Sequence, residues 1–197
     1  MWLPMSSFGI THEGGSLKRV LVHHPGKELE QANLDPKKHN FDGPVNIERF
    51  IAQHQRLIDA LSEAGVEVLD VGKTVRSDPA IATQTRQCPN LVFTRDSSIV
   101  TDAGSILMRM GLPSRRLETR IIKAAHQALG VAIGLELREP STFEGGGFAL
   151  IEGRVAVAGL CSRTTPGALE AVKNFLFESR VVDTFIVLNL PPDDIHI

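Results

Sequence analysis

The run Pro89-Asn90-Leu91-Val92-Phe93-Thr94-Arg95-Asp96 places an amide, an aromatic ring and a carboxylate close together in the sequence. This set suits a ligand that is cationic and planar at one end and hydrogen-bonding at the other. We expect Leu91 to Phe93 to form a buried strand and Asp96 to lie in the loop that follows it. Asp96 is then either a turn residue with a structural salt bridge or a charge that binds a cation.

A second carboxylate precedes three glycines in Phe143-Glu144-Gly145-Gly146-Gly147-Phe148. Three glycines allow positive φ angles or a close approach of the backbone to a ligand. The alternative is an ordinary tight turn that leads into a strand and leaves Glu144 in solvent.

Two arginine-containing segments open predicted helices. Arg163 lies in Gly159-Leu160-Cys161-Ser162-Arg163-Thr164-Thr165, where the amides of a helix start and a guanidinium fork could bind a carboxylate. Arg115 and Arg116 also lie at a helix start, an unfavourable place for cations, which suggests a specific role. The alternative is that Arg163, Arg116 and Glu118 are ordinary surface charges.

The chain ends in Pro191-Pro192-Asp193-Asp194-Ile195-His196-Ile197, where we expect a new strand to begin. A histidine between isoleucines is either a core residue whose ring nitrogen is satisfied or a proton-transfer group. The segment alone does not choose between these roles.

Periodicity predicts a repeated order of strand, strand, helix and strand, at intervals of about 60 residues. Short turns between paired strands favour mixed sheets over a doubly wound parallel sheet, and the first strand is not followed by Gly-x-Gly-x-x-Gly. The segment from Lys27 to Gly43 is expected to be an excursion or loop. The predicted strands are 18–23, 66–71, 91–100, 105–110, 131–137, 148–151, 155–158 and 184–190, and the predicted helices lie within 47–65, 114–130 and 166–177.

Composition sets broader limits. The 197 residues are 42% apolar with a net charge of −2, so they suit one globular domain over 1–197 and do not suggest a nucleic-acid or anionic membrane surface. Cys88 and Cys161 fit no disulfide framework or metal motif, no apolar stretch reaches a membrane span, and Met1 to Ser7 does not resemble a secretory signal. We expect a cytoplasmic protein, and a homo-oligomer is compatible with the sequence.

Taken in order, these segments resemble the arginine deiminase branch of the guanidino-group-modifying superfamily. The family's Pro-Asn-x-x-Phe-Thr-Arg-Asp run matches Asn90, Phe93 and Asp96. Its Glu-Gly-Gly-Asp run matches Glu144 to Gly146, with Gly147 in place of aspartate. Its Gly-x-Ser-x-Arg-Thr run matches Gly159 to Thr164, with Cys161 in place of serine, and its His-x-Asp run is matched only by His196 and Ile197.

The resemblance implies a pentein-type α/β propeller of five strand-strand-helix-strand modules, of which about three are visible here. It also implies hydrolysis of L-arginine to L-citrulline and ammonia without a metal or organic cofactor. A cysteine thiolate attacks the guanidinium carbon, ammonia leaves, and water hydrolyses the thiouronium intermediate. Dimethylarginine hydrolysis and amidino transfer are the alternatives within the superfamily.

The resemblance assigns a role to each matched residue. Asp96 would bind the guanidinium, and His196 would act as general acid and base. Glu144 would orient His196 and favour its charged form. The groups expected to bind the α-carboxylate are Asn90, Arg115 and Arg163, while the Phe93 ring would pack along the substrate.

The departures from the family pattern affect the chemistry. Neither Cys88 nor Cys161 matches the family's nucleophilic cysteine, which lies near the C-terminus of the family, and the aspartate after the histidine has no counterpart. We therefore expect the sequence to be an incomplete catalytic domain. The alternative from another class is a non-catalytic remnant that binds arginine.

Overall fold

The computed structural model describes residues 8–191 and 194–197, so the predictions on Met1–Ser7 and on residues 192–193 lie outside it. Contacts divide the chain into two compact units. Unit 1 consists of Met1–Gly15, Arg95–Pro113 and Leu129–Ile197, and unit 2 consists of Ser16–Thr94 and Ser114–Ala128. No helix among the described residues is long and apolar enough to cross a membrane. The expectation of a single domain over 1–197 stays a prediction.

Unit 1 contains two three-stranded sheets with the same topology. In each, an antiparallel pair is extended by a third strand that runs parallel to the second. The first sheet comprises β3 (Ser98–Thr101), β4 (Gly104–Leu107) and β5 (Ile133–Glu136), and the second comprises β6 (Phe148–Ile151), β7 (Val155–Leu160) and β8 (Thr184–Asn189). The predicted mixed sheets are therefore confirmed, as strand-strand-helix-strand order requires.

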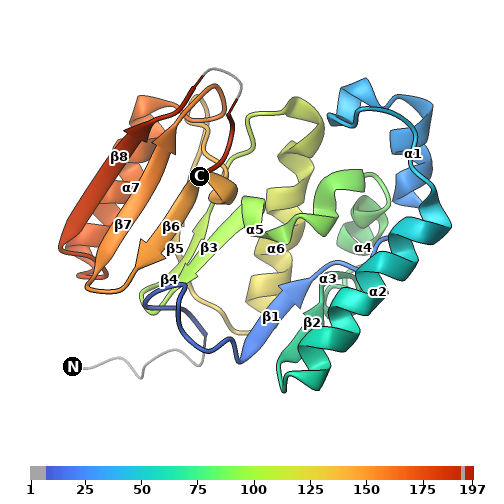
Figure 1. The fold of residues 1–197 in the computed structure, drawn as a ribbon, viewed down its shortest axis with the longest axis horizontal. Coiled ribbons are helices and arrows are strands. Elements are labelled where there is room, and N and C mark those ends of the chain that lie inside the picture. The colour runs from blue at the N-terminus through green and yellow to red at the C-terminus, as the bar shows by residue number, and fades with distance from the viewer. Residues whose placement is uncertain (1–7, 192–193) are drawn as a thin grey trace. The chain divides into compact units, whose positions relative to one another are not determined.

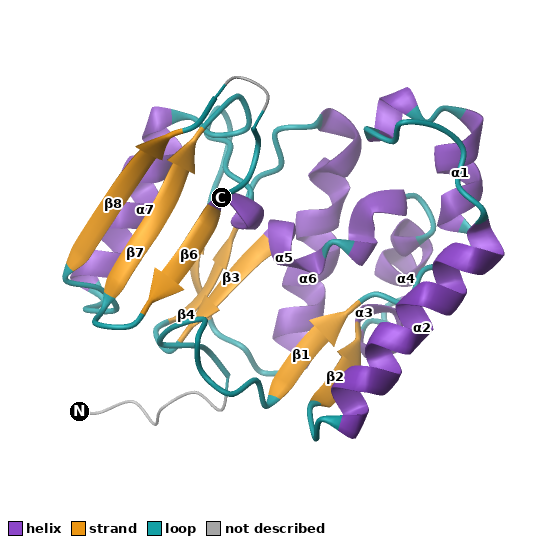
Figure 2. Ribbon diagram, in the orientation of Figure 1, coloured by secondary structure: helices purple, strands orange, loops and turns teal. Residues whose placement is uncertain are grey.

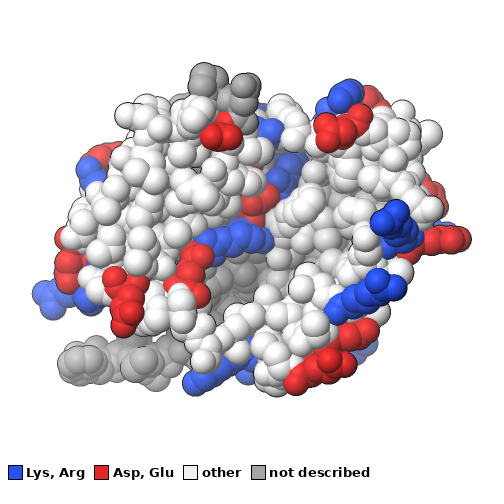
Figure 3. All heavy atoms as spheres, viewed as in Figure 1, with Lys and Arg blue, Asp and Glu red and all other residues white. Residues whose placement is uncertain are grey.

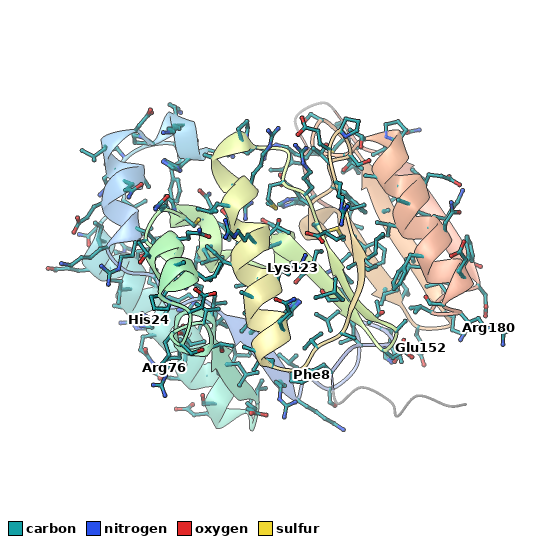
Figure 4. All side chains as sticks on the ribbon, turned by 180° about the vertical axis from the view of Figure 1, so that it is seen from behind. Phe8, His24, Arg76, Lys123, Glu152 and Arg180 are labelled. Carbon is teal, nitrogen blue, oxygen red and sulfur yellow. The ribbon has the colours of Figure 1, made fainter. Side chains whose placement is uncertain are left out.

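Helix α7 (Pro166–Glu178) connects β7 to β8 and lies behind their sheet in Figure 1. Thr165 occupies its predicted N-cap position with Pro166 in the first turn, and the Thr165 hydroxyl accepts a hydrogen bond from the Thr142 amide at 3.0 Å. The turn before β7 and the turn before β8 lie at the same end of this sheet, where Figure 4 labels Glu152 and Arg180. The segments meet there because the Asp183 amide donates to the Arg154 carbonyl oxygen at 2.8 Å.

The core of unit 1 lies between its sheets and α7. The rings of Phe143 and Phe148 meet edge to face, with centroids 6.4 Å apart, a geometry that aromatic pairs prefer. Burial of these side chains fixes the positions of the strand ends and of the loop that carries Glu144. The other buried side chains of this core include Ile99, Ile106, Met108, Leu150, Leu169, Val172 and Leu176.

Unit 2 is mainly helical, as the purple ribbons in Figure 2 show, around the parallel pair β1 (Arg19–Val22) and β2 (Glu67–Asp70). Helix α2 (Ile47–Glu63) connects these strands, and the Asn46 side chain caps it by accepting from the Arg49 amide. Gly65, with φ of +80°, ends the helix as the sequence predicts. The remaining helices are α1 (Glu28–Leu34), α3 (Val71–Thr74), α4 (Pro79–Thr85) and α6 (Arg116–Ala128), which packs against α3 and α4.

Three local predictions are wrong. The expected loop from Lys27 to Gly43 contains α1 and the 3-10 turn η1 (Lys37–His39). The strand expected to start at 91–93 is replaced there by the 3-10 turn η2 (Pro89–Val92). A strand was also expected to begin near His196, but the described residues 194–197 form none. Short apolar runs do not distinguish a buried helical turn from a strand, which explains the error at η2.

Charged side chains of both signs occur on one face of the molecule. On the face that Figure 3 shows, lysines and arginines are interspersed with aspartates and glutamates among a larger area of other residues. This distribution is in keeping with the net charge of −2.

Candidate active site

In unit 1, the side chains of Asp96, Glu144 and His196 converge; we call them the carboxylate–imidazole cluster. Nε2 of His196 lies 3.7 Å from Oδ1 of Asp96 and 3.6 Å from Oε2 of Glu144. Asp96 is 6% exposed and Glu144 only 1%, whereas the His196 side chain is 35% exposed. Two buried carboxylates therefore face an imidazole that solvent can reach.

The backbone of the glycine run makes this convergence feasible. Glu144 has extended backbone angles and precedes the 3-10 turn η4 (Gly145–Gly147), in which the Gly147 amide donates to the Glu144 carbonyl oxygen at 2.9 Å. A Cβ atom on Gly146 would lie 2.7 Å from Oδ1 of Asp96 and 2.8 Å from the His196 ring. Only glycine at 146 lets both side chains occupy their places.

Glu144 is held by two donors on its other oxygen. Its Oε1 accepts from the Gly111 amide at 2.9 Å and from Nη1 of Arg163 at 3.2 Å. These bonds orient the carboxylate so that Oε2 faces His196. The alternative of a solvated Glu144 is wrong. The role of Gly111 has no signal in the sequence, because any residue can supply a backbone amide.

Asp96 belongs to the short helix α5 (Thr94–Ser97), and not to a loop after a strand as predicted. The turn places Asp96 in the interior, while its neighbour Arg95 donates to the Phe148 carbonyl oxygen at 2.6 Å and pairs with Glu13. The structural salt bridge in this motif is therefore made by Arg95 with Glu13, and the Asp96 carboxylate faces His196.

In unit 2, Asn90, Phe93, Arg115 and Glu118 form what we call the arginine–amide cluster. Arg115 donates from Nε to Oε1 of Glu118 at 3.0 Å and from Nη2 to Oε2 at 2.8 Å. Arg115 is 5% exposed and Glu118 0%, so the alternative that Glu118 is a surface charge is wrong. Their spacing of three residues was the available signal, since side chains at that spacing meet on a helical turn.

The neighbours of Arg115 complete the arginine–amide cluster. Its guanidinium carbon lies 5.9 Å from the centre of the Phe93 ring, which is 47% exposed. Asn90 is buried, and its Nδ2 donates to the His39 carbonyl oxygen at 3.1 Å. Because a carbonyl can only accept, this bond fixes which end of the Asn90 amide is the nitrogen.

The two cysteines have different environments. Cys88 is fully buried in unit 2, and burial together with the negative charges of Glu118 and Glu28 raises the pKa of its thiol to about 12. Such a thiol is not a nucleophile near neutral pH, because the thiolate is the reactive form. Cys161 lies in unit 1 and is partly exposed.

The donor types of the carboxylate–imidazole cluster suit more than one kind of ligand. Its ligand-type atoms lie within 4.8 Å of one another, and carboxylate and imidazole donors bind divalent cations as well as organic cations. Geometry alone therefore indicates a cation site without selecting the cation.

Comparison with known proteins supplies the missing information. A model of the arginine deiminase family matches residues 82–196, more than half of the chain. The chain belongs to the arginine deiminase family. The matched segment includes all seven residues that the sequence pattern selects, from Asn90 to His196.

Curated relatives in this family are longer than the chain. The arginine deiminase of Rhodococcus opacus (strain B4) is 26% identical over 91% of the chain, and that of Mycobacterium avium (strain 104) is 36% identical over 91%. The chain spans about 62% of the Rhodococcus protein and 63% of the mycobacterial one.

Solved structures show the same fold. A dimethylarginine dimethylaminohydrolase from Pseudomonas aeruginosa, a mutant in complex with citrulline, superposes with a TM-score of 0.71 at 21% identity, covering 92% of this chain and 64% of that one. The N-terminal domain of ArgZ, a cyanobacterial arginine dihydrolase bound to substrate, gives 0.67 at 22% identity, covering 89% and 59%. The mixed α/β fold is thus that of guanidino-modifying enzymes.

Proposed function

We propose that the complete protein hydrolyses the guanidino group of L-arginine to give L-citrulline and ammonia. The observation that carries the proposal is the convergence of Asp96, Glu144 and His196 in unit 1 of an arginine deiminase family chain. Membership of this family supports a guanidinium as the cation that the cluster binds. The contacts of each residue then suggest its role in the reaction.

A guanidinium is planar, permanently charged and rich in N–H donors. Taking it out of water is costly unless carboxylates accept those hydrogen bonds. Asp96, 6% exposed and with Oδ1 directed toward His196, supplies such an acceptor. We assign Asp96 to the guanidinium nitrogens, next to the group that must exchange protons with them.

His196 is the proton-transfer group in this proposal. Its side chain is 35% exposed, so water can reach it, and its Nε2 faces both carboxylates. A neighbouring negative charge favours the imidazolium form, which can protonate the departing nitrogen. The neutral imidazole that results then removes a proton from the water that attacks the thiouronium carbon.

Glu144 is assigned a positioning role. With Oε1 occupied by the Gly111 amide and Arg163, its Oε2 is directed at His196. The carboxylate thereby orients the imidazole and stabilises its positive charge during the first proton transfer.

By their positions in the family pattern, Asn90, Arg115 and Arg163 are assigned to the α-carboxylate of arginine, and the Phe93 ring is assigned to the guanidinium or its aliphatic stem. Arg115 donates to Glu118 and Arg163 donates to Glu144, so either arginine would have to share its guanidinium donors to bind a carboxylate. Five donors on each guanidinium make such sharing feasible.

A cytoplasmic location of the protein stays a prediction.

The repeated topology of the two sheets in unit 1 supports the further proposal of a pentein-type propeller of five modules in the complete protein. The nucleophilic cysteine is assigned to the part of the longer relatives that this chain does not match, since Cys88 is fully buried with a pKa near 12. Attack by that thiolate on the guanidinium carbon releases ammonia, and water then restores the thiolate as citrulline forms.

The same cluster without a nucleophile would bind arginine and not convert it, which is the second candidate function. The observation that favours it is that the chain spans about 62% of its Rhodococcus relative. Incubating the protein encoded by the complete coding region with L-arginine, and measuring citrulline, separates the two functions. Dimethylarginine and an arginine–glycine mixture in parallel incubations test dimethylarginine hydrolysis and amidino transfer.

A further inference from the structure

Two departures from the family pattern lie at one place in unit 1. Sγ of Cys161 is 3.4 Å from the carbonyl oxygen of Ile195, and a Cβ on Gly147 would lie 3.9 Å from the same oxygen. Ile195 directly precedes His196 in the sequence. Both residues that depart from the family pattern thus lie near the Ile195 carbonyl, in the peptide group that joins Ile195 to the proposed proton-transfer residue His196.

The direction of each hydrogen bond at Cys161 follows from its partners. A carbonyl oxygen can only accept, so the thiol proton is directed to Ile195. The Arg163 amide donates to Sγ at 3.4 Å. Because the thiol has one proton and Ile195 receives it, the Thr164 hydroxyl, 3.5 Å away, is the donor in its contact with sulfur. The sulfur atom therefore connects the Arg163 turn to the His196 segment.

The segment around His196 is held by backbone contacts on both sides of that residue. The described residues 194–197 belong to no helix or strand. The Ile197 amide donates to the Gly146 carbonyl oxygen at 3.3 Å, on the far side of His196 from the Cys161 contact. The hydrogen bond to Ile195 ties this segment to the Arg163 turn, and the hydrogen bond from Ile197 ties it to the glycine run.

Gly147 complements this arrangement. An aspartate there would begin 3.9 Å from the Ile195 oxygen and 4.0 Å from the Gly159 oxygen, placing a carboxylate among acceptors. The one proton that Cys161 offers is already used by Ile195. Glycine at 147 therefore adds no further acceptor beside the Ile195 and Gly159 oxygens.

We propose that Cys161 is a positioning residue for His196: its thiol holds the Ile195 carbonyl and thereby sets the imidazole against Asp96 and Glu144. The effect of Cys161 on catalysis rests on the proposed function, whereas its effect on the position of His196 does not depend on any activity. Cys161 acts here as a hydrogen-bond donor and not as a nucleophile.

Three variants of the complete protein test this role. Cys161→Ser keeps a donor at the same place, Cys161→Ala removes it, and Ser162→Ala alters an exposed neighbour in the same turn as a control. We expect Cys161→Ala to lower kcat about 10- to 100-fold with KM changed less than about threefold, because a misplaced acid costs the chemical step more than binding. The pH profile of kcat should shift with it. Cys161→Ser and Ser162→Ala should retain kcat within about threefold.

A second readout keeps the test independent of turnover. In the 197-residue chain, the imidazole resonances of His196 and the hydrogen exchange of the Ile197 amide are measured by NMR for the same variants. Cys161→Ala should shift the His196 resonances and accelerate exchange at Ile197, while Cys161→Ser should do neither. If Cys161→Ala leaves both unchanged, or if serine is as damaging as alanine, the positioning role is wrong. If the NMR changes occur in a protein without citrulline production, the positioning stands and the proposed function fails.

Discussion

The Nε2 atom of His196 lies 3.6 Å from Oε2 of Glu144, while the other oxygen of the same carboxylate accepts from the Gly111 amide and from Arg163. Glu144 therefore cannot rotate away from the imidazole without losing two hydrogen bonds. One oxygen of Glu144 thus anchors the side chain to the backbone and to Arg163, and the other faces the proposed proton-transfer group.

Gly146→Ala should disrupt the carboxylate–imidazole cluster while leaving the protein folded. The new methyl group would lie 2.7 Å from Oδ1 of Asp96 and 2.8 Å from the His196 ring, so at least one of them must move. A displacement of about 1 Å at a reacting group can cost about 100-fold in rate, so we expect citrulline formation to fall by that order.

The control for this variant is Gly167→Ala in the first turn of α7, where the nearest atom to the added Cβ is the Ser141 hydroxyl at an ordinary 3.7 Å. Alanine in a helix should raise stability by about 0.5–1 kcal/mol, and turnover should not change. Equal turnover in Gly146→Ala and Gly167→Ala would show that residue 146 does not constrain the site.

Glu118→Gln should destabilise unit 2 markedly. Arg115 is 5% exposed and pairs with Glu118 at 2.8 Å, so the substitution removes a negative charge next to a buried cation. We expect the free energy of unfolding to fall by about 3 kcal/mol in urea titrations.

Glu170→Gln is the matched control, because Glu170 and Lys173 form an ion pair with the same three-residue spacing on the exposed side of α7. Exposed pairs contribute about 0–1 kcal/mol, so this variant should change stability by no more than that. If the two substitutions cost the same, burial does not distinguish the pairs.

The buried His126 should make unit 2 sensitive to mild acid. Burial lowers the pKa of His126 from 6.5 to about 4, so the unfolded chain binds a proton that the folded chain does not between these pH values. The titration of His126 therefore does not reduce the free energy of unfolding above pH 6.5, and it reduces that free energy increasingly as the pH falls toward 4. Between pH 7 and pH 5 the loss should be about 2 kcal/mol.

His126→Leu removes this titration, so the difference in unfolding free energy between pH 7 and pH 5 should shrink by about the same 2 kcal/mol, whatever the variant's stability at pH 7. Urea titrations at the two pH values measure this difference. An unchanged pH dependence would show that the pKa of His126 is the same in the folded and unfolded chains.

The sequence predicted the second sheet of unit 1 well because its signals are local. Val155 begins a strand after a Gly153 turn, and Pro166 begins a helix after Thr165, as in the structure. The turn at 89–97 was mispredicted because a run of three apolar residues carries no periodicity, and tertiary burial decided its conformation.

The site shows the same limit. Asp96, Glu144 and His196 were selected by motif, but their convergence depends on contacts between segments far apart in the chain. The Gly111 amide that holds Glu144 has no side-chain signature, because any residue can supply a backbone amide. In the arginine–amide cluster, the three-residue spacing of Arg115 and Glu118 indicates that they can meet, but only the fold determines that Glu118 is buried. Residue types indicate the chemistry, whereas the supporting hydrogen bonds follow from the fold.

The central claim is that the carboxylate–imidazole cluster serves hydrolysis of a guanidinium, and citrulline production from L-arginine by the complete protein tests it most directly. Wild type should form one citrulline per ammonia released. Asp96→Ala should abolish turnover, because it removes the carboxylate assigned to the guanidinium nitrogens. A complete protein that forms no citrulline, or an Asp96→Ala variant that forms it at the wild-type rate, would contradict the account.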